Sequence, residues 1–349
     1  MTKISIIIPL YLSSNFIEKL NESLIKQTFH NLEIIYINDE SPDDSYFKVL
    51  NAAKNDDRIK IINKQNEGQA AALNDGIKVS TGNYIMFLDS DDWIEINTCE
   101  LAFESAAKYD ADMVFWPNIK EYATKSVYYP GFFSSSKLFD ENEMSFLRRR
   151  MIGLIGEELK EPMKTDAFNA GWGKLYKADI IKRNGIKWTD TKLVGSSDVL
   201  FNAQLIPYIK RAFYLDKHLH HYNKDNPNAL TKTYNNTLKS KFENLFVELE
   251  KIILENYAEE KKIMSEALNN RIALSIINLG LGYSKTAFNL KGYKLFNDLM
   301  KSEPFWSSLK NLKTKYLPIQ FRIFFELVKM RMAFPAFFIL IIMSKLRDK

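Results

Sequence analysis

Short apolar runs alternate with helix-like spacing through the first third of the chain. Ile4–Ile8 is a continuous β-branched run that ends at Pro9, which is typical of a parallel strand buried on both faces. Phe16, Leu20 and Leu24 then recur at helical spacing. The alternation continues, with further strands expected at 34–37, 59–62, 84–88 and 113–116 and helices at 15–29, 44–54, 69–79 and 94–109. Strands that alternate with helices in this way predict βαβ units and a parallel or mixed sheet flanked by helices, an α/β fold.

The remaining chain is less regular. Residues 119–165 carry no clear periodicity, residues 172–214 return to a mixed α/β pattern, and residues 238–300 contain no proline and are expected to be helical. We therefore predict an α/β domain at 1–232, with a first half at 1–116 and a second half at 165–232, followed by a helical region at 233–349.

The C-terminal segment, residues 310–349, has a pattern of its own. Phe334–Met343 is almost wholly apolar and is flanked by Lys329 and Arg331 before it and by Lys345 and Arg347 after it. The run is roughly half of the ~20 residues needed to span a bilayer. Basic flanks and aromatic content favour a helix that lies in the membrane interface. A core helix packed on the rest of the protein is the alternative.

Composition allows a large folded core, because 46% of the 349 residues are hydrophobic and 26% are charged. The net charge of +5 is unevenly spread. Residues 310–349 contain nine basic and two acidic side chains, a net charge of +7, which leaves the rest of the chain at −2. A nucleic-acid-binding protein would carry its positive charge on the folded domain, so no nucleic-acid partner is expected. Contact with an anionic membrane through the tail is expected instead.

The number of cysteines and the first residues of the chain indicate the cellular compartment in which the protein is expected. A single cysteine, Cys99, excludes an internal disulfide bond and thiolate zinc sites. Met1–Ser5 leads directly into the first strand-like run, so no signal peptide is expected. Both features fit a protein of the reducing cytoplasm.

An acidic cluster follows the strand expected at 84–88. Asp89, Asp91 and Asp92 place three carboxylates within four residues, with Ser90 between them. Such a cluster is stable when a hard cation, Mg²⁺ or Mn²⁺, neutralises it. In parallel sheets ligands bind beyond the carboxyl ends of the strands, where Tyr11 and Asp39 are also expected. The alternative is a solvated acidic turn in which Asp92 caps the following helix.

Four ordered blocks carry a resemblance to a known family. They are 5–11 (SIIIPLY), 37–41 (INDES), 66–76 (NEGQAAALNDG) and 82–93 (GNYIMFLDSDDW). With them, residues from Lys3 to about Thr231 resemble the family 2 glycosyltransferases of the GT-A fold, of the bacterial surface-polysaccharide type. That resemblance implies a nucleotide-sugar-binding first half and an acceptor-side and catalytic second half.

The resemblance also implies roles for individual residues. Asp91 would hold the metal, together with Asp89. The nucleotide-sugar, expected to be a UDP-sugar, would be bordered by Pro9, Tyr11, Asp39, Asn66, Gly68, Asn74, Asp89 and Ser90. Of these, Pro9 and Tyr11 would line the uridine pocket and Asp39 would take the uracil or the ribose. Tyr11 alone is equally consistent with ordinary loop packing.

The second half resembles the family more weakly. Trp172 and Lys174, within Trp172–Tyr176, correspond to an acceptor-side block. In residues 194–201 (VGSSDVLF), Ser197 replaces the first acid of a pair that relatives carry, and Asp198 keeps the second, which is the general base in inverting members. The alternative is that Asp198 only caps its helix.

The segment 218–231 also resembles the family. His220 is a further candidate metal ligand, and Lys224 could face a phosphate or the acceptor side. The alternation within 218–222 fits a plain strand equally well.

Together these features predict an inverting, metal-dependent glycosyltransferase. It would transfer a sugar to a hydroxyl of a glycan or lipid-linked oligosaccharide of capsule or lipopolysaccharide type, at the inner face of the cell membrane. Because Ser197 departs from the pattern, a non-catalytic nucleotide-sugar-binding subunit of a glycan-assembly complex is the alternative. A homo-oligomer stays open.

Overall fold

A computed structural model describes residues 2–166, 168–227, 237–284 and 288–347. They form two compact units. Unit 1 comprises Met1–Leu147, Asn169–Thr191 and Leu200–Thr233, and unit 2 comprises Arg148–Phe168, Lys192–Val199 and Tyr234–Lys349. Two internal segments of the chain thus group with the C-terminal helices. The predicted domain boundary at residue 232 stays a prediction.

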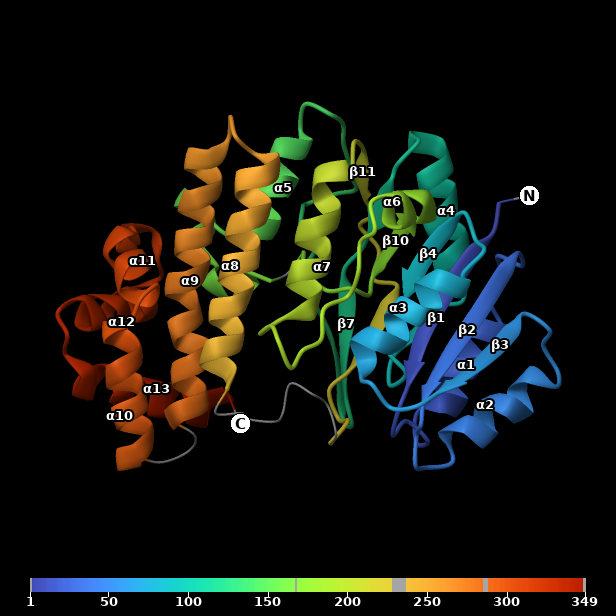
Figure 1. Cartoon of the computed structure of the whole chain (residues 1–349), viewed down its shortest axis with the longest axis horizontal. Coiled ribbons are helices and arrows are strands. Elements are labelled where there is room, and N and C mark those ends of the chain that lie inside the picture. The colour runs from blue at the N-terminus through green and yellow to red at the C-terminus, as the bar shows by residue number, and fades with distance from the viewer. Residues whose placement is uncertain (1, 167, 228–236, 285–287, 348–349) are drawn as a thin grey trace. The chain divides into compact units, whose positions relative to one another are not determined.

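Unit 1 is built on a mixed sheet of eight strands in the order β3-β2-β1-β4-β10-β6-β11-β9 (Figure 1). The strands are β1 (Ile4–Leu10), β2 (Leu32–Asp39), β3 (Ile59–Lys64), β4 (Tyr84–Phe87), β6 (Met113–Phe115), β9 (Lys137–Phe139), β10 (Lys174–Lys177) and β11 (Ala212–Tyr214). β1 and β2 are buried along their whole length, as their continuous apolar runs predict. β3, β2, β1 and β4 run parallel, and β10 is antiparallel to both β4 and β6. The predicted α/β class is confirmed, and of the two predicted forms, parallel or mixed, the sheet is mixed.

The helices of unit 1 follow the predicted alternation with shifted ends. They are α1 (Ile17–Ile25), α2 (Ser45–Ala53), α3 (Gln69–Val79), α4 (Thr98–Tyr109) and α6 (Ala178–Arg183). α3 begins and ends where the sequence predicts, and Gly68 precedes it with φ +92°, a conformation that favours glycine. The helix expected from residue 94 begins only at Thr98, because Trp93–Ile94 is a strand.

A second sheet of four strands lies in the same unit, in the order β5-β12-β7-β8. Its strands are β5 (Trp93–Ile94), β12 (His220–Asn223), β7 (Asn118–Tyr122) and β8 (Lys125–Tyr128). Residues 119–165 therefore contain β7, β8, β9 and α5 (Met144–Ile152), and the expectation of an irregular segment is wrong. β5 pairs with β12, which brings His220 and His221 beside the strand that follows the acidic cluster.

Unit 2 is helical after residue 237, as predicted. Its helices are α8 (Leu238–Asn256), α9 (Lys261–Ser284), α10 (Leu290–Lys301), α11 (Phe305–Asn311), α12 (Ile319–Lys329) and α13 (Ala333–Arg347). α8 and α9 lie side by side (Figure 1), and α9 also packs against α10, α11 and α13. α13 contributes Phe337 and Leu340 to the core, so the predicted apolar tail is a packed helix of this unit. Among the described helices, none combines the length and the apolar character needed to cross a bilayer.

A buried carboxylate joins β1, β2 and the turn before β4 at the end of the sheet away from the acidic cluster. Glu33 accepts hydrogen bonds from Ser5, from the backbone N–H groups of Thr81 and Gly82, and from the ammonium of Lys60 at 2.8 Å. Burial raises the pKa of Glu33, but the hydrogen bonds from Lys60, Ser5 and Thr81 outweigh burial and hold the pKa below its ordinary value.

Replacing Glu33 with glutamine should lower the free energy of unfolding by about 1.5–3 kcal/mol at pH 7, because it removes the charge from a buried carboxylate that accepts several hydrogen bonds and pairs with the half-exposed Lys60. Since the folded protein lowers this pKa, the stabilisation is present above the unfolded-state pKa of about 4.3 and is lost as the pH falls further. Urea unfolding at pH 7 and pH 3 measures this. A difference between wild type and Glu33→Gln that stays the same at both pH values would contradict it.

Candidate active site

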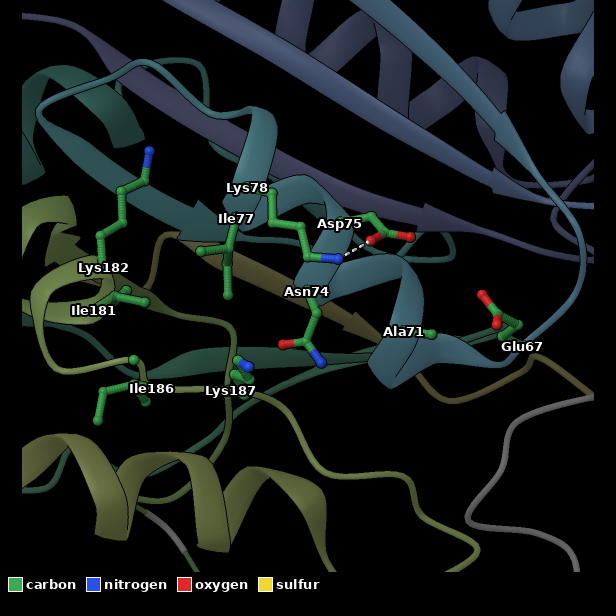
Figure 2. A pocket seen from close by; sticks show the side chains of 11 residues that line it. Glu67, Ala71, Asn74, Asp75, Ile77, Lys78, Ile181, Lys182, Ile186 and Lys187 are labelled. Carbon is green, nitrogen blue, oxygen red and sulfur yellow. Dashed lines mark hydrogen bonds and ion pairs between the residues drawn. The ribbon is translucent and has the colours of Figure 1, made fainter.

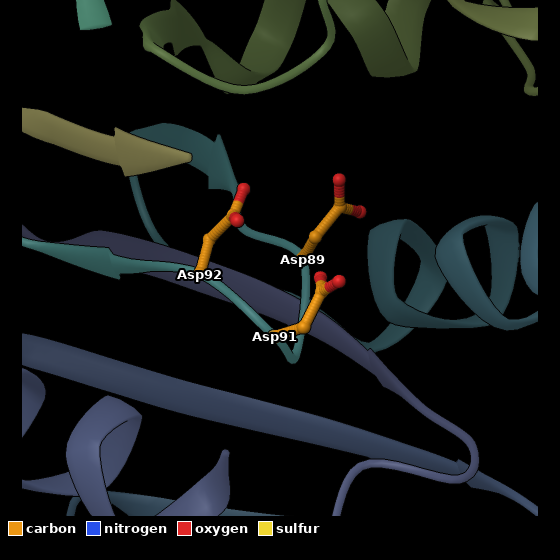
Figure 3. A group of neighbouring side chains, drawn as sticks. All are labelled: Asp89, Asp91 and Asp92. Carbon is orange, nitrogen blue, oxygen red and sulfur yellow. The ribbon is translucent and has the colours of Figure 1, made fainter. Parts of the chain in front are cut away.

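The acidic cluster lies in the loop between β4 and β5. Asp89, Asp91 and Asp92 each offer an oxygen, and these oxygens lie within 4.8 Å of one another. Figure 3 shows the three side chains projecting to the same side of the loop. The loop follows a buried strand, so its backbone is fixed at the carboxyl end of the sheet, where parallel sheets bind ligands.

Asp89 and Asp91 are half-buried and are oriented by amide side chains from distant parts of the chain. Gln69 donates to Asp89 at 2.9 Å, and Asn226 donates to Asp91 at 2.6 Å. A carboxylate oxygen accepts more than one bond, so both groups keep acceptor capacity. The groups available as metal ligands are carboxylates that lie close together. Oxygen ligands of this kind fit a hard divalent cation such as Mg²⁺ or Mn²⁺.

Asp92 has a different environment. It is buried, accepts from the backbone N–H of Asn223 at 2.8 Å, and lies 2.8 Å from Nε2 of His220. Burial and the neighbouring charge of Asp91 raise the pKa of Asp92 well above its ordinary value. Burial lowers the pKa of His220 to about 3, so its imidazole is neutral. Asp92 therefore connects the loop to β12, and the idea that it caps the following helix is wrong.

Trp93, directly after the cluster, is held from both sides. The ammonium of Lys19 lies 3.2 Å from the centre of its ring, and the ring of His221 stacks on it at 5.0 Å. His221 in turn lies within hydrogen-bonding distance of Glu95 and Glu121. These contacts fix the exit of the acidic loop through cation–π and stacking interactions.

The predicted acceptor-side residues lie around His220. The ring of Trp172 stacks on His220 at 4.3 Å and lies 5.3 Å from the ring of Tyr222. The ammonium of Lys224 lies 4.5 Å from the centre of the Tyr222 ring. Lys174 is buried and donates to the carbonyl oxygen of Ala170. Trp172 and Lys224 thus belong to one aromatic group beside the acidic loop, and Lys174 is part of the core.

The loop before α3 is bound to the end of β2. Both oxygens of Asp39 accept backbone N–H bonds, from Glu67 at 2.9 Å and from Gly68 at 2.8 Å. The side chain of Asn66 donates back to the Asp39 carbonyl oxygen at 2.9 Å. These bonds hold the segment predicted to border the donor at the same edge of the sheet as the acidic cluster.

The residues predicted to line the nucleotide pocket differ in exposure. Pro9 is buried within β1, whereas Tyr11, just beyond the strand, is 46% exposed. Ser90 is buried and its hydroxyl lies 2.5 Å from that of Ser13. Tyr11 is therefore the side chain of this group with a ring surface available for stacking.

Asn74 lies on α3 and contacts the chain after α6. Its side-chain amide donates to the Trp188 carbonyl oxygen and accepts from the Trp188 N–H, both at 2.9 Å. Asn74 lines a cleft of about 460 Å³ between α3 and residues 181–187. Figure 2 shows its side chain among the others that line this cleft. Both polar ends of the amide are used within the protein, so Asn74 joins α3 to the chain after α6.

Asp198 is the second residue of α7 (Ser197–Leu205) and belongs to unit 2, whereas the acidic loop belongs to unit 1. The helix begins at Ser197, and the hydroxyl of Ser196 accepts from the Val199 N–H at 3.5 Å. Ser196 thus occupies the N-cap position, and the alternative that Asp198 is the N-cap is wrong.

Several contacts at this site carry no signal that sequence reasoning could use. Gln69 and Asn226, which orient Asp89 and Asp91, are separated from them by 20 and 135 residues. The pairing of Asp92 with His220 spans 128 residues. Residues 228–231, the end of the predicted resemblance, lie outside the described residues.

Comparison with known proteins decides the family. The sequence profile described as glycosyl transferase family 2 matches residues 5–184, just over half of the chain. The chain belongs to glycosyl transferase family 2. Family membership was predicted from the four sequence blocks and is confirmed. The matched region contains the acidic loop, the Asp39 loop and Trp172.

Two relatives illustrate the similarity. EpsJ of Bacillus subtilis, an uncharacterised glycosyltransferase, is 31% identical over 229 residues, which cover 66% of this chain and 63% of EpsJ. The glycosyltransferase GlyA of Streptococcus pneumoniae is 32% identical over 225 residues, which cover 63% of this chain and 30% of GlyA. The chain thus spans less than two thirds of the length of either relative.

The crystal structure of S. aureus TarS 1–349 in complex with UDP-GlcNAc has a similar fold. Its TM-score is 0.71 at 18% identity, and the match covers 99% of this chain and 92% of that of TarS. At this identity the similarity concerns the fold, which agrees with the GT-A type predicted for family 2.

Proposed function

We propose that this protein is an inverting, metal-dependent glycosyltransferase that uses a UDP-sugar. The observation that carries the proposal is the cluster of Asp89, Asp91 and Asp92 at the carboxyl end of β4 in a family 2 chain. Because carboxylates at such spacing favour a bound hard cation, the cluster is suited to a metal–diphosphate complex.

The donor is assigned to the loops at the carboxyl ends of β1, β2 and β4. Tyr11 offers an exposed ring for the uracil, and the Asp39-bound loop before α3 borders the sugar nucleotide. TarS, which has the same fold, was crystallised with UDP-GlcNAc, and this supports a UDP-sugar over other nucleotide sugars.

The chemistry is a single displacement at the anomeric carbon. Asp89 and Asp91 would hold Mg²⁺ or Mn²⁺, which when bound neutralises charge on the diphosphate. Gln69 and Asn226 keep the two carboxylates oriented for that task. Asp198 takes the proton from the acceptor hydroxyl, which is a poor nucleophile while it keeps that proton.

The acceptor is a hydroxyl of a glycan or lipid-linked oligosaccharide in surface polysaccharide synthesis. Trp172 presents a partly exposed ring beside the acidic loop, which suits stacking on a sugar. An enzyme that acts on such an acceptor would contact the inner face of the cell membrane peripherally, through the basic segment 310–349.

A panel of nucleotide sugars tests the proposal. Incubation of the protein with each donor, with Mn²⁺ and with EDTA, should release UDP slowly from one UDP-sugar and only in the presence of metal. The matched control is the Asp91→Ala variant with the same donor. Metal-dependent UDP binding without any hydrolysis or transfer would contradict catalysis and favour the non-catalytic subunit.

A further inference from the structure

Helix α13 has two apolar faces. One face is buried in unit 2 through Ala336, Phe337, Leu340, Ile341 and Ser344. The other carries Phe334, Phe338 and Ile342, which are 60%, 55% and 46% exposed. Beside them on the same helix are the half-buried Pro335, Ile339 and Met343. The helix is therefore held in place by its core face and is apolar on its exposed face as well.

The spacing makes the exposed side chains one surface. Residues four apart lie above one another on a helix, so Phe334, Phe338 and Ile342 form a continuous strip. The ring of Phe288, itself 51% exposed, lies 6.0 Å from that of Phe334 and extends the strip at one end. A contiguous exposed apolar surface of this kind indicates an interaction site.

The positive charge around the strip indicates which partner it binds. Arg331 precedes the strip, Lys345 follows it, and both are exposed. The segment 310–349 has nine basic and two acidic residues, a net charge of +7. A second copy of the chain would bring the same positive charge to the interface and be repelled, whereas anionic lipid headgroups attract it.

The length of α13 determines whether the helix can cross a bilayer or only lie on its surface. α13 has 15 residues and is therefore about 22 Å long, shorter than the ~30 Å hydrocarbon core of a bilayer. Because its core face is already buried in protein, only the exposed face is available to lipid. An apolar helix face flanked by cations is suited to lying parallel to the membrane surface.

We propose that the face formed by Phe334, Phe338 and Ile342, named here the α13 face, binds the surface of an anionic lipid bilayer. The inference rests on the membrane contact in the proposed function and deepens it by naming the surface. The contact is made by one side of a packed helix. The side chains of Arg331 and Lys345 remain at headgroup level.

Sedimentation with vesicles tests the α13 face. The variant F334S/F338S/I342S should bind phosphatidylglycerol vesicles at least about 30-fold more weakly than wild type, because three exposed apolar side chains lose their transfer free energy. The matched control is V247S/L254S/I263S, whose parent side chains are 51%, 52% and 42% exposed on α8 and α9 of the same unit. The control should bind as wild type does. Vesicles of phosphatidylcholine should bind wild type weakly.

A charge variant keeps the test decisive if the triple variant does not fold. Lys345→Glu should weaken binding to phosphatidylglycerol vesicles by about tenfold or more, because it reverses one exposed charge at the membrane surface. Deleting residues 332–349 is unsuitable, because it would remove Phe337 and Leu340 from the core.

Three results would contradict lipid binding by the α13 face. They are no binding of wild type to phosphatidylglycerol vesicles, equal binding by folded F334S/F338S/I342S, or a wild-type dimer that this variant converts to a monomer. Hydrolysis of the UDP-sugar in solution separates this inference from the proposed function. A folded triple variant that loses vesicle binding should hydrolyse the donor as wild type does. Vesicle binding by a wild type that hydrolyses no donor would retain the docking surface and reject the enzyme.

Discussion

Replacing Asp91 with alanine is expected to reduce sugar transfer by at least about 10³-fold while the protein still folds. A metal on the diphosphate supplies several kcal/mol of charge stabilisation in the transition state, and each 1.4 kcal/mol corresponds to a tenfold change in rate. Asp91 is half-buried in a loop and accepts a hydrogen bond from the side-chain amide of Asn226, so its removal should leave the core of the sheet intact. Calorimetric titration with UDP, with and without Mn²⁺, measures the metal-dependent part of binding directly.

The matched control for Asp91→Ala is Asp57→Ala, which removes an exposed aspartate of the same unit. It should transfer sugar and bind UDP as wild type does. If Asp91→Ala keeps the full metal-dependent gain in UDP affinity, Asp91 is not the ligand. Asp89 with a different partner would then have to be considered.

The strands in the core of the sheet could be predicted from the sequence. Strands that form only by pairing with a segment far away in the chain could not. β1 and β2 were recognisable because their continuous apolar runs are local signals. Ile94, the second residue of β5, was predicted to begin a helix, because a strand of two residues has no periodicity of its own. It exists only because β12, more than 120 residues later, pairs with it. The same sheet explains why residues 119–165 looked irregular.

The residues of the candidate site also fall into two classes, those with a local signal in the sequence and those without one. Asp89, Asp91 and Asp39 were identified because they follow predicted strands directly, and position in the chain was enough to place them at one edge of the sheet. Ligand contacts of Lys174 and Asn74 stay predictions, and in the structure their side chains bond to the backbone at Ala170 and Trp188. Residue type alone does not tell whether a lysine or an asparagine is satisfied within the protein.

Replacing Asp198 with asparagine is the sharpest test of the mechanism. If Asp198 is the general base, kcat at saturating donor should fall by roughly 10²-fold or more, because asparagine keeps the shape of the side chain but cannot take a proton. Because Ser196 occupies the cap position and Asp198 lies inside the first turn, the loss of charge at the helix N-terminus should lower stability by about 0.3–1 kcal/mol. Asparagine keeps the size of the side chain and one carbonyl oxygen that can accept a hydrogen bond. The melting temperature should therefore change little.

Asp179→Asn is the matched control, because Asp179 is the second residue of α6 as Asp198 is of α7. It loses a carboxylate at the same helical position and should keep kcat within about twofold, since its charge at a helix N-terminus contributes only to stability. Transfer kinetics and melting curves of both variants separate the two roles of such an aspartate. If Asp198→Asn and Asp179→Asn both retain nearly full kcat, Asp198 serves only its helix. The proton would then have to go to another group, and the substitution of Ser197 for the first acid would favour a non-catalytic subunit.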